Sequence, residues 1–158
     1  MRIMGIDPGI AIVGFGIIEI NGHKMSPVSY GAITTPAHTP IGERLLTIKN
    51  NLETVIEKHQ PTVCGIEEVF FSKNVKTAMQ VSHARGVILC TLESYKIPAF
   101  HYSPTAIKSA IIGYGNADKK QVQFMTKELL KLPKVPKPDD VADALAIAIC
   151  HHHSVQLG

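Results

Sequence analysis

The sequence of 158 residues contains no tryptophan, only 6% aromatic residues and only three cysteines. Cys64, Cys90 and Cys150 are an odd number, lie far apart and each stand in an apolar run. They therefore fit neither a disulfide framework nor a zinc site with paired cysteines. Because free cysteine is among the most frequently buried residues, we expect all three to be reduced residues of the core.

Long apolar runs are also missing. The longest strongly apolar stretches, 9–18 and 141–150, are too short or too polar for a helix that crosses a membrane, which needs about 20 apolar residues. The first residues lead directly into a strand-like segment and show no secretory signal. We expect one domain over residues 1–158, cytoplasmic and without a membrane segment, since this length suits a single compact core.

Neither sign of charge dominates the sequence. It has 16 Lys and Arg residues against 13 Asp and Glu residues, a formal net charge of +3 with neutral histidines. This mildly basic balance permits an anionic partner but does not require one.

The hydrophobic pattern predicts an α/β protein with the element order βββαβαβααα. Three strands are expected near 2–7, 11–20 and 25–34, because β-branched residues alternate there and Asn21-Gly22 is a hairpin signal. The remaining expected elements are a helix over 40–60, a strand over 62–69, a helix over 74–95, a strand over 97–102, and helices after Ser103, over 118–131 and over 139–152. This order predicts a five-stranded mixed sheet with helices on both faces.

Acidic side chains stand at the ends of two predicted strands. Asp7 ends the first strand, and Glu67 and Glu68 end the fourth. Because side chains alternate along a strand, only one of the two glutamates can point toward a given neighbour. A turn-forming aspartate before Pro-Gly, and a pair of solvated acids at a strand end, are the structural alternatives to a functional role.

A third acidic group lies in the last predicted helix. Asp140 and Asp143 are three residues apart and so share a helix face. Apolar residues surround Asp143 in almost every helical direction, which predicts a buried helix, and a buried carboxylate needs a partner or a metal ion. Asp139 and Asp140 also have a structural alternative, since either could cap the helix.

Carboxylate ligands without neighbouring cysteines or paired histidines favour hard divalent ions such as Mg²⁺ or Mn²⁺ over zinc. Mg²⁺ held by few carboxylates keeps open positions for water and for substrate phosphate. If the three acidic elements meet, the chemistry that they indicate is phosphoryl transfer to water, with two ions about 3.5–4 Å apart.

Five blocks of the sequence occur in an order and spacing that resembles the RuvC-type Holliday-junction resolvases, which are crossover junction endodeoxyribonucleases. The blocks are GIDPG (5–9), GIEEVFFSKN (65–74), HARG (83–86), YSPTAIKSAIIGYGNADKKQVQFM (102–125) and DDVADALAIA (139–148). The resemblance implies a ribonuclease H-like fold and a homodimer that resolves four-way DNA junctions by paired symmetric nicks in recombination and repair. It also implies a site for two Mg²⁺ ions, with Mn²⁺ as a substitute, and a branch-migration helicase partner of the RuvA and RuvB type.

The resemblance identifies four carboxylates as both catalytic residues and metal ligands: Asp7, Glu67, Asp140 and Asp143. In part of the family a histidine stands where Asp140 is here, so the role of this residue is the most replaceable of the four. Lys108 and Lys119 match lysines near the scissile phosphate, where they could act as catalytic residues that stabilise developing charge.

The resemblance further implies contacts to DNA through a set of aromatic and basic residues: Phe70, Lys73, Lys76, Lys108, Lys119 and Lys120. Phe70 aligns with an aromatic that stacks on an unpaired base, a contact worth about 1–3 kcal/mol. An ordinary core or interface phenylalanine is the alternative for Phe70. A solvated surface charge is the alternative for any single lysine, and Lys120 has no separate support from the family.

Two further segments carry expectations. The helix over 74–95 has a broad apolar face, most of which we expect in the core, and the resemblance implies that a helix in this region builds the dimer interface. His151, His152 and His153 point in different helical directions and cannot all reach one metal ion, so we expect them at a frayed helix end.

Two other functions remain as alternatives. One alternative is a non-catalytic module that binds junctions. Four acids beside the phosphates argue against it, because they would not help a protein that only binds DNA. An actin-like phosphotransferase shares the GIDxG start, but it needs a second domain to close over its nucleotide, and 158 residues leave no space for one.

Overall fold

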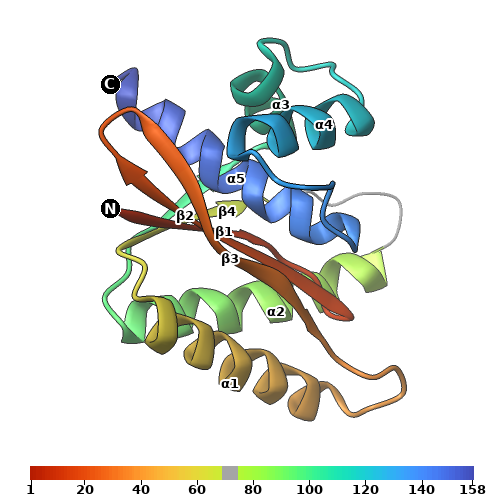
Figure 1. Ribbon diagram of the computed structural model, residues 1–158. Helices are drawn as coiled ribbons and strands as arrows, with labels where there is room; N and C mark the ends of the chain where they lie inside the picture. The colour runs from red at the N-terminus through yellow and green to blue at the C-terminus, as the bar shows by residue number, and fades with distance from the viewer. Residues whose placement is uncertain (69–74) are drawn as a thin grey trace.

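The computed structural model describes residues 1–68 and 75–158, and its centre is a five-stranded sheet with the order β3-β2-β1-β4-β5 (Figure 1). The strands are β1 (Arg2–Asp7), β2 (Ile12–Asn21), β3 (Lys24–Thr34), β4 (Val63–Glu67) and β5 (Ala99–Tyr102). β1, β2 and β3 pair antiparallel, whereas β4 pairs parallel with both β1 and β5. The predicted mixed sheet is therefore confirmed.

Helices cover both faces of this sheet (Figure 1). The helices are α1 (Ile41–His59), α2 (Val75–Ser94), α3 (Pro104–Ile112), α4 (Lys119–Leu130) and α5 (Asp139–Gln156). α1 and α2 lie on one face, and α5 lies on the other with α3 and α4 outside it. In the described part of the chain, no helix is both long enough and apolar enough to span a membrane.

Alternation along β1 assigns its side chains to two separate cores. Ile3 packs in one cluster with Leu145 of α5, whereas Met4 and Ile6 pack in the other with Ile48 of α1. Because successive side chains of a strand point to opposite faces, Asp7 is in step with Ile3 and belongs to the face that α5 covers.

Glycines let α5 lie very close to the sheet. A Cβ atom on Gly5 of β1 would stand 1.9 Å from the carbonyl oxygen of Ala144, and one on Gly14 of β2 would stand 2.0 Å from the carbonyl oxygen of Asp140. Neither distance is possible for a real Cβ atom, so only glycine permits this approach. The first turn of α5 is therefore held against the sheet beside the end of β1.

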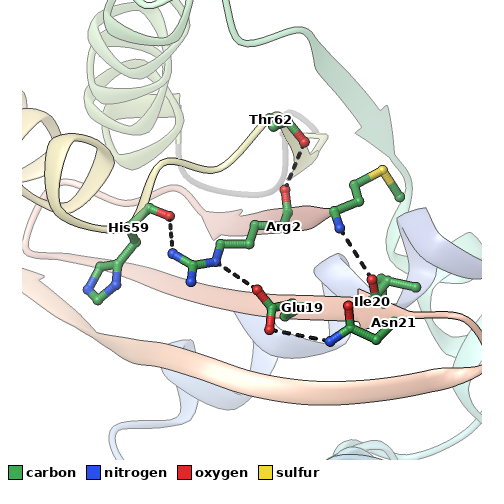
Figure 2. Close-up of polar contacts among 7 residues, drawn as sticks. Arg2, Glu19, Ile20, Asn21, His59 and Thr62 are labelled. Atoms are coloured by element: carbon green, nitrogen blue, oxygen red, sulfur yellow. Dashed lines mark hydrogen bonds and ion pairs between the residues drawn. The ribbon is translucent and has the colours of Figure 1, made fainter.

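A polar cluster anchors the opposite end of β1 (Figure 2). The Arg2 guanidinium donates to Glu19 Oε1 of β2 at 3.1 Å and to the carbonyl oxygen of His59, in the last turn of α1, at 2.6 Å. Thr62, just before β4, donates its hydroxyl to the carbonyl oxygen of Arg2 at 3.3 Å. These contacts join β1, β2, the end of α1 and the start of β4.

Two expectations about single residue types are wrong. Cys64 and Cys150 are buried as predicted, but Cys90 is exposed because it lies on the outward side of α2. His151 and His152 are not at a frayed end, because α5 continues to Gln156 and leaves these side chains only 2% and 6% exposed. His151 is buried against β5, where its ring contacts Phe100 and its Nδ1 lies 2.7 Å from the Tyr102 hydroxyl.

The expected core face of α2 is also only partly correct. Ala78, Ala84, Ile88 and Leu92 are its buried apolar residues. Other members of the predicted apolar face point outward: Val75 is 63% exposed and Met79 is 54% exposed. A low-polarity stripe of α2 therefore remains on the surface of the chain.

Candidate active site

The carboxyl ends of β1 and β4 bring Asp7 and Glu67 together. The two strands are adjacent and parallel, and Ile6 pairs in register with Ile66, so the next residue of each strand lies at the same edge of the sheet. The two side chains are hydrogen-bonded to each other, with one carboxyl group protonated and donating. A single proton therefore bridges two acids from segments 60 residues apart in the sequence.

Strand alternation separates Glu67 from Glu68. Cys64 and Ile66 of β4 pack in the core under α1 and α2, so Glu67 points to the opposite face, toward α5. Burial lowers the pKa of Arg85 in α2, whereas the charges of both Glu68 and Glu67 act to raise it, with Glu68 contributing more. Only Glu67 shares the face of Asp7.

The first turns of α5 add two more carboxylates. The Asp140 backbone lies against Gly14, which is the antiparallel partner of Asp7 across β1 and β2. Asp143, one turn further along α5, lines the same cleft as Glu67. Four acids from β1, β4 and α5 therefore surround one edge of the sheet.

The electrostatics of Asp7 follow from this gathering. Burial, and after it the negative charges of Glu67, Asp143 and Asp140, raises the pKa of Asp7 from its ordinary 3.8 to about 9. Burial also raises the pKa of Glu67 and of Asp143, although Lys119 acts against the rise at both residues. The site therefore accumulates negative charge that the surrounding protein only partly neutralises.

Lys119 and Lys108 supply the neighbouring positive charge. Lys119 Nζ lies 3.4 Å from Asp143 Oδ2, and Lys108 stabilises the ionised form of Glu67. Local structure fixes both lysines. Ser103 caps the N-terminus of α3, where its hydroxyl accepts from the Ala106 amide, and Asp118 caps α4 through a reciprocal capping box. Lys119 is therefore the first residue of a capped helix.

Two of the four acids, Glu67 and Asp143, line a cleft of about 300 Å³ together with Lys108 and Lys119. The same cleft also has apolar lining residues, among them Ile107, Val122 and Ile147. Because acids and lysines line one cleft, it is suited to a phosphate group that binds a cation held by the acids and also contacts the lysines.

The donor set fits a hard divalent cation. All four clustered side chains offer carboxylate oxygens, which suit Mg²⁺ or Mn²⁺, and a cation would relieve the repulsion that raises the pKa of Asp7. Within residues 1–68 and 75–158, no group of three or more His, Cys, Asp or Glu side chains is already arranged as ligands of one ion. The shared proton and Lys119 instead offset only part of the charge of the acids.

The remaining predicted DNA contacts differ in their surroundings. Lys76 is exposed in the first turn of α2, and Lys120 is exposed beside Lys119 but does not line the cleft. Phe70 and Lys73 lie outside the described residues, so the predicted stacking role of Phe70 stays a prediction.

Two residues near the site were given no site role from the sequence: Arg85 was not singled out, and Asp139 was considered only as a helix cap. Arg85 donates to the carbonyl oxygen of Glu67 and contacts Nδ1 of His101, joining α2 to β4 and β5. Asp139 forms an ion pair with Lys119 as well as with Lys137. The HARG block contains Arg85, but a backbone carbonyl as its partner leaves no signal in the sequence.

Relatives in sequence are similar over nearly the whole chain. A crossover junction endodeoxyribonuclease RuvC from Desulfitobacterium hafniense is 51% identical, with 99% of this chain and 95% of that protein covered. A protein of the same description from Clostridioides difficile is 52% identical, with 99% of this chain and 93% of that protein covered.

Two of the solved structures that are similar to this chain come from a RuvC protein. The RuvC structure from Thermus thermophilus superposes with a TM-score of 0.93 at 32% identity, covering 100% of this chain and 97% of that one. The same protein in complex with a Holliday junction substrate gives a TM-score of 0.95, also at 32% identity, covering 100% of this chain and 96% of that one.

The strand order, the helices on both faces and the acidic edge define a nuclease of the ribonuclease H-like class. Residues 3–151 match the family described as crossover junction endodeoxyribonuclease RuvC. The chain therefore belongs to the RuvC family, as its sequence blocks indicated.

Proposed function

We propose that this chain cuts four-way DNA junctions by divalent-metal-dependent hydrolysis of phosphodiester bonds, placing symmetric nicks in two strands of like polarity. The observation that carries the proposal is the gathering of four carboxylates from β1, β4 and α5 around Asp7, with two lysines at the same cleft. Family membership supplies the substrate class. The Thermus thermophilus relative has been seen with a Holliday junction substrate.

In this proposal Asp7, Glu67, Asp140 and Asp143 would hold two Mg²⁺ ions, with Mn²⁺ as a substitute. Such ions would supply activation of a water molecule and stabilisation of the leaving oxygen. For Asp7 to act as a ligand, the proton that it shares with Glu67 would have to pass to solvent. The positive charge of the ions would then offset the repulsion among the four carboxylates. The buried position of α5 keeps Asp143 at the cleft.

The two lysines act on the substrate. Lys108 stands in the second turn of α3 and Lys119 is the first residue of α4, and both line the cleft beside Glu67 and Asp143. There they stabilise the negative charge that develops on the phosphate during hydrolysis. Exposed Lys76 and Lys120, together with Lys73, contribute contacts to the DNA backbone, and Phe70 stacks on a base near the crossover.

The proposed assembly is a homodimer. The outward stripe of α2, which includes Val75, Met79, Gly86 and Cys90, has the low polarity of an interface and the spacing of one helix face. Two copies related by symmetry place two active sites on one symmetric junction. We further propose that the dimer works in the cytoplasm with a branch-migration helicase of the RuvA and RuvB type.

The test compares an immobile four-way junction with a linear duplex of the same sequence, each with Mg²⁺ or with a chelator. We expect nicks in the junction alone, and only with Mg²⁺. Asp7→Asn should still bind the junction, but its cleavage rate should fall by about a hundredfold or more, since a metal ligand is lost.

Glu68→Gln is the matched control for Asp7→Asn. Glu68 is the acid next to Glu67, but strand alternation directs it to the face opposite Asp7, so we expect cutting close to that of the unaltered protein. Unchanged cleavage by Asp7→Asn would refute the metal-ligand role. Junction binding without any cleavage, at all Mg²⁺ concentrations, would favour a non-catalytic binding module.

A further inference from the structure

A row of alternating charges runs across the rim of the acidic site. Lys137 Nζ lies 3.0 Å from Asp139 Oδ1, and Asp139 Oδ2 lies 3.6 Å from Lys119 Nζ. Lys119 Nζ in turn lies 3.4 Å from Asp143 Oδ2. The Lys119 ammonium therefore stands between two carboxylates of the same helix, one of which belongs to the proposed metal site.

The two carboxylates differ in how deeply they lie. The Asp139 side chain is 44% exposed, while that of Asp143 is 30% exposed. They are four residues apart on α5 and so project from the same side of the helix. A lysine at the start of α4 can therefore exchange one partner for the other by a small change of its side chain.

A divalent ion and Lys119 would compete for Asp143. If Asp143 binds a cation, its oxygens are no longer fully available to the ammonium, and two positive charges close together repel each other. Without a second partner, Lys119 would turn away into solvent, since its side chain is already 56% exposed. Asp139 is the carboxylate within reach that is not one of the four proposed ligands.

Asp139 is itself held in place. Lys137 donates to Oδ1, and Gln123 of α4, which is only 8% exposed, also hydrogen-bonds this side chain. A carboxylate fixed by two neighbours loses little further freedom when it accepts a third. We propose, on the basis of the function proposed above, that Asp139 is a positioning residue that keeps Lys119 at the cleft while Asp143 binds a divalent ion.

The test measures Mn²⁺ binding by calorimetry, in the full-length protein without DNA, for four forms of the chain. These are the unaltered protein, Asp139→Asn, Lys119→Met and the double variant. Asp139→Asn keeps the size of the side chain and removes its charge. We expect it to weaken Mn²⁺ binding about two- to fivefold, the range that a partly exposed ion pair gives, because Lys119 then has only Asp143 as a partner.

The double variant distinguishes two ways in which Asp139 could affect Mn²⁺ binding, by positioning Lys119 or by adding negative charge near the site. If Asp139 acts through Lys119, Asp139→Asn should have no effect on Mn²⁺ binding in the Lys119→Met background. An equal loss in both backgrounds would mean that Asp139 merely adds negative charge, which would overturn the proposal. No loss in either background would overturn it as well.

Single-turnover cleavage at saturating Mn²⁺ is the second measurement. Asp139→Asn should lower the rate constant with junction affinity unchanged, and Asp139→Glu should restore most of it, because it restores a carboxylate for Lys119. Failure of Asp139→Glu to restore the rate would count against the proposal. Asp139→Ser serves as a second charge-removing variant if the asparagine variant is unstable.

The outcome for the unaltered protein tests a different claim. If it neither binds Mn²⁺ nor cuts the junction, the proposed function itself fails. If it does both, and Asp139→Asn behaves like it in every measurement, only the role of Asp139 is refuted.

Discussion

Stability and function place opposite demands on the protonation of Asp7. It is held beside three other acids in a partly buried position, and its pKa of about 9 means that the fold prefers its protonated form. A metal-binding role requires the ionised form. The protein without metal is therefore less stable than it would be with a neutral side chain at this position.

This conflict predicts a pH-dependent stability. The folded-state pKa of Asp7 lies above its ordinary 3.8, so the stability that its protonation contributes is fully present below pH 3.8 and is lost as pH rises through about 9. At pH 8 in chelator, Asp7→Asn should therefore be more stable than the unaltered protein, on the order of 1–3 kcal/mol.

Urea unfolding of both forms at pH 5 and pH 8 measures this effect. The advantage of Asp7→Asn should shrink at pH 5, because pH 5 is closer to the ordinary pKa of 3.8 that Asp7 has in the unfolded chain, so taking up the proton on folding costs less free energy there than at pH 8. Addition of Mg²⁺ at pH 8 should stabilise the unaltered protein and leave the variant nearly unchanged. An advantage of equal size at both pH values would contradict the electrostatic explanation.

The contact between β1 and α5 decides where the acids meet. Gly5 lies under the carbonyl oxygen of Ala144, and Gly14 lies under that of Asp140. Sequence patterns identified both the strand and the helix, because their hydrophobic periods are local. They did not reveal how closely the two elements pack, since that depends on residues 139 positions apart in the chain.

Gly5→Ala should disturb this contact directly. The added Cβ atom would stand 1.9 Å from a backbone carbonyl oxygen, so α5 must move away from the sheet. We expect a loss of about 3 kcal/mol in the free energy of unfolding, measured with urea, together with lower cleavage.

Gly42→Ala is the matched control for this substitution. Gly42 lies in the first turn of α1 and has no atom within 4 Å of its would-be Cβ position. The same change there should raise the free energy of unfolding by about 0.4–1 kcal/mol, because alanine restricts the unfolded chain. Equal losses at both glycines would mean that the close approach of α5 is not the cause.

The low-polarity stripe of α2 lies on the surface of the molecule, since Val75 and Met79 are exposed. α2 itself lies on the face of the sheet opposite α5 (Figure 1). This arrangement supports the proposed homodimer. Met79→Glu, which puts a charge in the middle of the stripe, should raise the dissociation constant of the dimer about tenfold or more, equivalent to about 1.4 kcal/mol. Sedimentation equilibrium at several concentrations measures this constant.

Val155→Glu provides the comparison for Met79→Glu. Val155 is 56% exposed, close to the 54% of Met79, but it lies near the end of α5. The charge at Val155 should leave the dimer intact. If Met79→Glu also remains a dimer, the second copy binds at another surface.

The sequence by itself determined the element order, the alternation along β1 and β4, and the family to which the chain belongs. These properties are carried by local periodicity and by blocks of neighbouring residues, so no knowledge of distant contacts was needed. Strand alternation even required that Glu67 and Glu68 point to opposite faces.

Only the tertiary structure decided which of those faces α5 covers, that Lys119 stands between Asp139 and Asp143, and that His151 is buried while Cys90 is exposed. Each of these facts depends on which distant segments pack together and how closely. The pKa of Asp7 has the same origin, because burial and the approach of three other acids raise it only once β1, β4 and α5 meet.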